Sequence, residues 1–81
     1  MGPRDILNKL EWHPNFDLNK AKITITHRGA PRDKLTIPGE DIIDLGSGFM
    51  KVKRKNKKVE IPYHRILKIE TPEKTLWEET S

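Results

Sequence analysis

The pattern of apolar and polar residues first predicts a short helix near the start of the chain. Pro3 is favoured in the first turn of a helix, and three apolar residues follow it at helical spacing: Ile6, Leu7 and Leu10. The sequence HPN at 13 to 15 disfavours helical backbone before its proline. We therefore expect one amphipathic helix over residues 3 to 11.

Alternation with a period of two predicts short strands further along the chain. In KITITHR, residues 22 to 28, one face carries Ile23, Ile25 and His27, which indicates a half-buried strand that ends at Gly29. The following KLTIPG is stopped by its proline and is expected to be a brief edge strand. EDIIDL then precedes the breaker GSG.

Two hairpins are expected in the second half of the chain. Residues 49 to 54 and 57 to 61 alternate around a tip near Lys55 and Asn56, and their inward-facing residues would be Met50, Val52, Val59 and Ile61. ILKIE and TLWEE flank TPEK, whose proline predicts a tight turn. These elements add up to a single domain over residues 1 to 81 of the α+β class. In it, the N-terminal helix packs on a curved antiparallel sheet or small open barrel of about five or six short strands.

Composition narrows the class of protein. The chain has no cysteine, which excludes disulfides and thiolate metal sites, and its three scattered histidines do not replace them, so we expect no metal and no cofactor. No window is long and apolar enough for a membrane span, and charges stand where a signal peptide would be apolar, so we expect a cytoplasmic protein. Glutamine is absent and charged residues make up 35%, as in proteins of thermophiles. A monomer is the default expectation.

The net charge of +4 has a local origin. Residues 51 to 58, KVKRKNKK, contain six of the sixteen Lys and Arg, namely Lys51, Lys53, Arg54, Lys55, Lys57 and Lys58. The other ten cations stand against twelve acids, which leaves the rest of the chain at −2. Such a cluster attracts polyanions such as RNA, although a solvated turn that protects an edge strand would have the same composition.

Two of the three histidines stand directly before an arginine, in the pairs His27-Arg28 and His64-Arg65. An imidazole beside a guanidinium suits an anion, and phosphate is the commonest anion so bound. The two pairs can converge only if their strands end at the same rim of the sheet. The alternatives are a core-edge histidine at 27, a turn-stabilising histidine at 64, and arginines in surface salt bridges.

The aromatic residues divide between the expected core and the candidate site. Tyr63 precedes His64 and is the aromatic best placed to stack on a base. Four others are expected to be core or helix-staple residues: Trp12, Phe16, Phe49 and Trp77. The chain has no Walker-type phosphate loop, no dinucleotide fingerprint and no metal-ligand pair at helical i, i+4 spacing.

The order of the motifs resembles a known family. PRDILNKLEW, ITHRGAPRD, IPGEDIIDLGSGFMKV, IPYHRILKIE and a final LW follow one another as in small uncharacterised archaeal proteins whose domain is called the RNA cyclic group end recognition domain. The resemblance covers nearly the whole chain, and its most specific parts are HRGAP and IPYHRI, whereas the basic tip at 53 to 58 resembles a variable insertion. In larger proteins, domains of this family stand beside RNA-processing modules. The resemblance implies recognition of RNA ends that carry a 2′,3′-cyclic phosphate, through His27, Arg28, His64 and Arg65.

Three functions are compatible with these residues. The first is an RNA-binding module without catalysis, in which Lys51 and Lys53 hold the upstream phosphates of a single strand or 3′ end. The second is a metal-independent phosphodiesterase with His27 and His64 as general base and acid. Two-histidine phosphoesterases carry Ser or Thr two positions after each histidine, and here these positions are Gly29 and Ile66. The third is a protein-interaction module whose basic tip binds an acidic partner. We expect the binding module rather than an enzyme.

Overall fold

The computed structural model describes residues 2–14 and 16–79 of the chain of 81 residues. The single domain expected over 1 to 81 includes residues at both ends that lie outside these described ranges. Among the described residues, one helix and seven strands form: α1 (Pro3–Trp12), β1 (Lys22–Thr26), β2 (Lys34–Pro38), β3 (Ile42–Leu45), β4 (Phe49–Arg54), β5 (Lys57–Pro62), β6 (Ile66–Glu70) and β7 (Thr75–Glu78). Four single-turn 3-10 helices connect them: η1 (Leu18–Lys20), η2 (Pro31–Asp33), η3 (Gly39–Asp41) and η4 (Tyr63–Arg65).

Helix α1 forms where the apolar spacing predicted it and ends one residue later than expected. At its start, the Asp5 carboxylate accepts a hydrogen bond of 3.3 Å from the Gly2 N–H. At its end, His13 adopts extended backbone (φ −83°, ψ 128°), as expected before a proline. Leu7 and Leu10 are buried against the sheets. This helix of 10 residues is too short to cross a bilayer, and no other helix in the described ranges is long enough.

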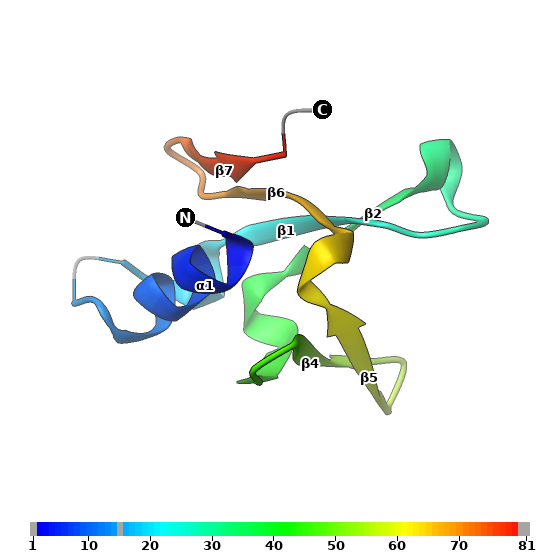
Figure 1. Ribbon diagram of the computed structural model, residues 1–81, viewed down its shortest axis with the longest axis horizontal. Coiled ribbons are helices and arrows are strands. Elements are labelled where there is room, and N and C mark those ends of the chain that lie inside the picture. Colours follow the sequence, from blue (N-terminus) through cyan, green and yellow to red (C-terminus); the bar gives the residue numbers. More distant parts are fainter. Residues whose placement is uncertain (1, 15, 80–81) are drawn as a thin grey trace.

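The strands form two antiparallel sheets, with orders β2-β1-β6-β7 and β3-β4-β5 (Figure 1). The α+β class is therefore confirmed. The expected number of about five or six strands is too low, because seven strands form, and they divide between two sheets. Strand β2 lies at an edge, as its proline predicted, and β6 and β7 form the final hairpin.

The chain passes between the two sheets twice through the same local structure. IPGEDI at 37–42 and IPYHRI at 61–66 both run from a strand, through a proline and a 3-10 turn, into an isoleucine that begins a strand of the other sheet. The prolines have nearly equal backbone angles, φ −65° and ψ 141° for Pro38 and φ −60° and ψ 143° for Pro62. Proline suits this position because its ring fixes φ and its missing N–H ends the ladder. The second crossover carries His64 and Arg65.

The core lies between the helix and the two sheets. Its buried members are Leu7, Leu10, Ala21, Ile23, Ile25, Ile37, Met50, Val52, Ile61, Tyr63, Ile66 and Ile69. Phe16 and Trp77 pack against it as expected, whereas Trp12 is 79% exposed at the end of α1 and is not a core residue. The prediction that Val59 faces inward is also wrong, since it lies on the edge strand β5 and is 37% exposed.

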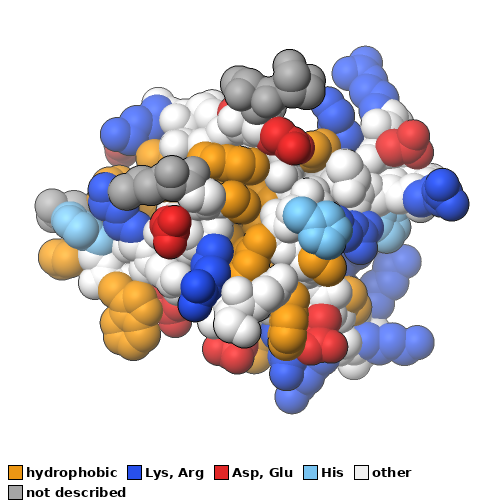
Figure 2. Space-filling view, viewed as in Figure 1, with side chains coloured by type: hydrophobic (Ala, Val, Ile, Leu, Met, Phe, Trp, Pro, Cys, Tyr) orange, Lys and Arg blue, Asp and Glu red, His pale blue; other side chains and the backbone are white. Residues whose placement is uncertain are grey.

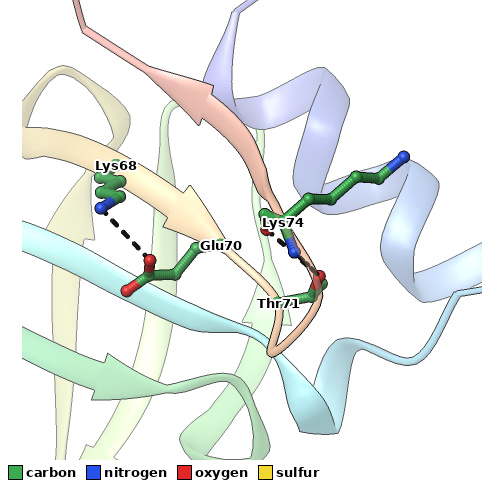
Figure 3. A network of polar contacts seen from close by, with 4 residues as sticks. All are labelled: Lys68, Glu70, Thr71 and Lys74. Atoms are coloured by element: carbon green, nitrogen blue, oxygen red, sulfur yellow. Dashed lines mark hydrogen bonds and ion pairs between the residues drawn. The ribbon is translucent and has the colours of Figure 1, made fainter.

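The turn between β6 and β7 is closed by hydrogen bonds between Thr71 and Lys74 (Figure 3). The Thr71 N–H donates to the Lys74 carbonyl over 2.8 Å, and the Thr71 hydroxyl donates to the same oxygen over 3.2 Å. The Lys74 N–H returns a bond of 3.3 Å to the Thr71 Oγ1. Beside this turn, Lys68 and Glu70 form an ion pair of 3.2 Å. It is the one ion pair within residues 2–14 and 16–79.

Candidate nucleic-acid interface

The pairing of β1 with β6 brings the two His-Arg dipeptides to the same edge of the first sheet. The two strands are antiparallel, with Ile25 opposite Ile66. The residues that follow β1 and those that precede β6 must therefore lie side by side. His27 and Arg28 follow β1, and His64 and Arg65 precede β6, so the condition for their convergence is met at the level of the backbone.

An open depression of about 370 Å³ lies at this edge. Its lining consists of Thr26, His27, Arg28, Asp33 and Arg65. Three of the four residues expected to bind the RNA end thus share one concave surface. The fourth, His64, is not part of the lining, and its side chain is exposed on η4. His64 is the sequence neighbour of Arg65, but only Arg65 lines the depression, because the two side chains leave the 3-10 turn in different directions.

Arg65 is fixed in place by the end of β1. Its Nη2 donates a hydrogen bond of 2.7 Å to the Thr26 carbonyl, across 39 positions of sequence. This bond satisfies an acceptor at the strand end and orients the guanidinium plane. A guanidinium has five N–H donors, and in the described part of the chain the others of Arg65 have no partner. They remain able to bind a ligand in the depression.

The loop after β1 holds its shape through backbone hydrogen bonds. The His27 N–H donates to the Asp33 carbonyl and the Asp33 N–H to the Ala30 carbonyl, each over 2.8 Å. Three residues have positive φ: 94° at Gly29, 59° at Arg32 and 55° at Asp33. Left-handed backbone at two consecutive residues other than glycine is uncommon and costs free energy, and such strain concentrates at functional sites.

The electrostatic character of the depression is cationic with one opposing charge. Arg28 and Arg65 each carry a permanent positive charge, and His27 is half-buried beside them. Neither arginine takes part in an ion pair within the described ranges, so the alternative of surface salt bridges finds no support there. Asp33 is the acidic residue of the lining, and the sequence analysis missed it. Its place in the short loop that joins β1 to β2 is the feature of the sequence that would have indicated it.

The basic hairpin of β4 and β5, residues 51 to 58, is a second cationic surface. Lys55 and Asn56 form its tip with φ of 49° and 64°, as in the tight turns typical of hairpins. The register places Lys53 opposite Lys58 and Arg54 opposite Lys57. Like charges in direct opposition repel one another and destabilise a hairpin. A bound polyanion would reduce this repulsion. Figure 2 shows Lys and Arg side chains along the side of the molecule where Figure 1 places this hairpin and the β1–β2 loop.

Tyr63 has a structural position that leaves it no face for a base. The residue is 8% exposed, and its hydroxyl donates a hydrogen bond of 2.7 Å to the Gly46 carbonyl. Burial raises the pKa of this hydroxyl above its usual value. The stacking role expected for Tyr63 is therefore not retained in the candidate site.

A metal centre is not indicated by the geometry of the described residues, which contain no cluster of three or more His, Asp or Glu side chains placed to hold an ion. The chemistry open to the depression is anion binding. Two guanidinium groups and one imidazole can donate hydrogen bonds to the oxygens of one phosphate group.

The chain is similar to archaeal proteins along nearly its whole length. A family model described as "MJ1316 RNA cyclic group end recognition domain" matches residues 1–79. A UPF0248 protein of Thermococcus onnurineus is 38% identical over 76 residues, which cover 93% of this chain and 82% of the relative. A UPF0248 protein of Archaeoglobus fulgidus is 32% identical over 71 residues, covering 88% and 96%. The UPF0248 protein MJ1316 of Methanocaldococcus jannaschii is 35% identical over 66 residues, covering 82% and 76%. No solved structure gives a significant match.

Proposed function

The chain belongs to the MJ1316 RNA cyclic group end recognition domain family, and we propose on this premise that it is an RNA-binding module for 3′ ends that carry a 2′,3′-cyclic phosphate. The observation that carries the proposal is the convergence of His27, Arg28 and Arg65 in one depression. These residues come from two segments separated by 37 positions or more, and the β1–β6 pairing brings them together.

The chemistry of the ligand fits such a site. A cyclic phosphodiester is a compact monoanion that cannot gain the second charge of a linear monophosphate. Its recognition depends on well-placed donors more than on total positive charge. Arg65, held at 2.7 Å from the Thr26 carbonyl, offers a guanidinium already oriented for the phosphate oxygens. Arg28 and His27 supply donors from the facing loop.

The basic hairpin supplies the remainder of the interface. Its cations, Lys51, Lys53, Arg54, Lys55, Lys57 and Lys58, attract the phosphates upstream of the RNA end regardless of sequence. Lys51 lies opposite Glu60. The four cations on the strands beside the tip face one another in like-charged pairs: Lys53 with Lys58, and Arg54 with Lys57. End recognition and backbone binding are thus assigned to different surfaces, and they can be tested separately.

Replacement of either arginine by lysine tests the end-recognition site. Arg28→Lys and Arg65→Lys keep the charge but remove the planar pair of donors, so affinity for cyclic-ended RNA is expected to fall by about 1 to 3 kcal/mol. Affinity for the same RNA with a 3′-hydroxyl should change little, because that end carries no phosphate for these donors. The measurement is a pair of titrations at fixed salt and pH.

The matched control is Arg54→Lys on the basic hairpin, outside the depression. It makes the same chemical change and should leave the difference between the two RNA ends intact. Equal affinity of the unmutated protein for cyclic and hydroxyl ends would refute end recognition and leave a general RNA-binding domain. Hydrolysis of the cyclic end that disappears in both His27→Ala and His64→Ala would instead support the phosphodiesterase.

A further inference from the structure

The candidate site contains one acidic side chain among its cations. Asp33 lines the depression together with His27, Arg28 and Arg65. Although two arginines lie in the same lining, the described residues show no ion pair between either of them and Asp33. Its side chain is exposed, and an aspartate carries a formal negative charge. A site that only maximised attraction for phosphate would gain nothing from this negative charge.

The backbone of Asp33 adopts a conformation that is uncommon for residues other than glycine. Its φ of 55° is left-handed and follows another left-handed residue, Arg32. Hydrogen bonds of 2.8 Å from the His27 N–H and to the Ala30 carbonyl hold the backbone of Asp33 at the end of the loop. The loop that holds this acidic residue in the lining of the cationic site therefore includes two consecutive left-handed residues, Arg32 and Asp33.

The two kinds of phosphorylated 3′ end differ in charge above pH 6. A linear 3′-monophosphate loses its second proton near pH 6 and becomes a dianion, whereas a 2′,3′-cyclic phosphate stays a monoanion. Two arginines alone would favour the dianion. A carboxylate in the same depression repels the dianion about twice as strongly as the monoanion, and it lowers the affinity for the linear end more.

We propose that Asp33 is a specificity-determining residue that disfavours linear 3′-phosphate ends relative to cyclic ones. This inference rests on the proposed function, since it assigns a role to Asp33 within the same depression. It adds a second criterion to end recognition: the arginines distinguish phosphate from hydroxyl, and Asp33 distinguishes a single from a double negative charge.

Asp33→Asn is the variant that isolates the charge. Asparagine is among the residues that adopt left-handed backbone most readily, and the loop is held by main-chain hydrogen bonds that the substitution leaves in place. The probes are three RNAs of one sequence, ending in a 2′,3′-cyclic phosphate, a linear 3′-phosphate or a 3′-hydroxyl. The matched control is Asp44→Asn, an exposed residue on β3 outside the depression.

At pH 8, Asp33→Asn is expected to shift the ratio of affinities toward the linear end by roughly three- to tenfold, the size of one screened charge interaction. At pH 5, where both phosphorylated ends carry one charge, the shift should fall below about twofold. The other titratable or charged residues of the lining, namely His27, Arg28 and Arg65, are present in both proteins, so their effect on the ratio cancels when the variant is compared with the unmutated protein at the same pH. Asp44→Asn should not change the ratio at either pH.

A ratio that Asp33→Asn leaves unchanged at pH 8 overturns this inference, provided that the unmutated protein still prefers the cyclic end to the hydroxyl. An equal shift at both pH values also overturns it, because the charge of the linear end would then play no part. Failure of the proposed function has a different signature, namely equal affinity for the cyclic and hydroxyl ends. Thermal unfolding of Asp33→Asn checks that the loop change has not unfolded the protein.

Discussion

At the scale of single residues, Tyr63 links the core to the candidate site. It is the first residue of η4, the turn that also carries Arg65, and its hydroxyl bonds to the Gly46 carbonyl 17 positions away. The residues next to Tyr63 in the sequence, Pro62 and His64, indicate an exposed turn. The burial of Tyr63 depends on a carbonyl brought close by the fold of the second sheet, which periodicity cannot predict. Arg65 is part of the lining of the depression, as convergence of the two strand ends requires, and its role as a site residue stays a prediction.

Tyr63→Phe is expected to lower the free energy of unfolding by about 0.5 to 1.5 kcal/mol, because the half-buried carbonyl of Gly46 loses its donor. Chemical denaturation measures this loss. The difference in affinity between cyclic and hydroxyl RNA ends should persist, since the ring contacts no RNA in this account. Loss of RNA binding without loss of stability would show that the phenol contacts the ligand.

The same residue predicts an effect of alkaline pH. Burial raises the pKa of the Tyr63 hydroxyl above 10.0, so the folded state holds this proton at pH values where the unfolded state releases it. The stability from the neutral phenol is complete below pH 10 and is lost as pH rises through the folded-state pKa. In Tyr63→Phe, the decrease in melting temperature above pH 10 should be smaller than in the unmutated protein. Equal decreases would remove Tyr63 as the cause.

At the scale of elements, the strands follow from local alternation, and their division into two sheets does not. The helix, the edge strand β2 and both hairpins were predicted because each is defined by neighbours in sequence. The prolines of the two IPxxxI crossovers indicate only where a strand ends, since a proline stops a ladder in either case. Their repeat in the sequence, at 37–42 and 61–66, is the signal that would have indicated two sheets.

Gly39→Ala tests the first crossover. A Cβ at Gly39 would overlap the Leu18 carbonyl oxygen, and the Gly39 N–H is held at 2.7 Å from the Ala21 carbonyl, so neither backbone can move freely. We expect a loss of stability of about 3 kcal/mol or more. Gly48→Ala is the control, because a Cβ there meets nothing within 4 Å. Similar melting temperatures for the two variants would contradict the close approach of η1 and η3.

The basic hairpin predicts the salt dependence of RNA binding. If about three phosphates are neutralised on a single strand, the slope of log K against log salt should be about −2, from roughly 0.7 per phosphate. Serine at Lys53, Arg54, Lys57 and Lys58 should flatten the slope. A control variant with four serines on other parts of the surface, at Lys9, Lys20, Lys22 and Lys74, should keep it. An unchanged slope in the hairpin variant would place the RNA backbone elsewhere.

At the scale of the whole molecule, the account depends on long-range pairing. The β1–β6 register joins segments about 40 positions apart and brings His27, Arg28 and Arg65 to one edge. The sequence could state this convergence only as a condition, because no local pattern fixes which strands are neighbours. The convergence of two strands at one rim does not guarantee that every side chain there faces the same way. His64 is the example, because it lies outside the lining of the depression.

The central claim is that the terminal cyclic phosphate binds in the depression between the ends of β1 and β6. The most direct test compares backbone amide spectra of the protein saturated with cyclic-ended RNA and with hydroxyl-ended RNA of the same sequence. The account predicts that the differences between the two spectra concentrate at residues 26–33 and 63–66, while signals of the basic hairpin, displaced by both RNAs, coincide. Differences confined to the hairpin, or to the segment around Phe16 that precedes the start of β1, would contradict it.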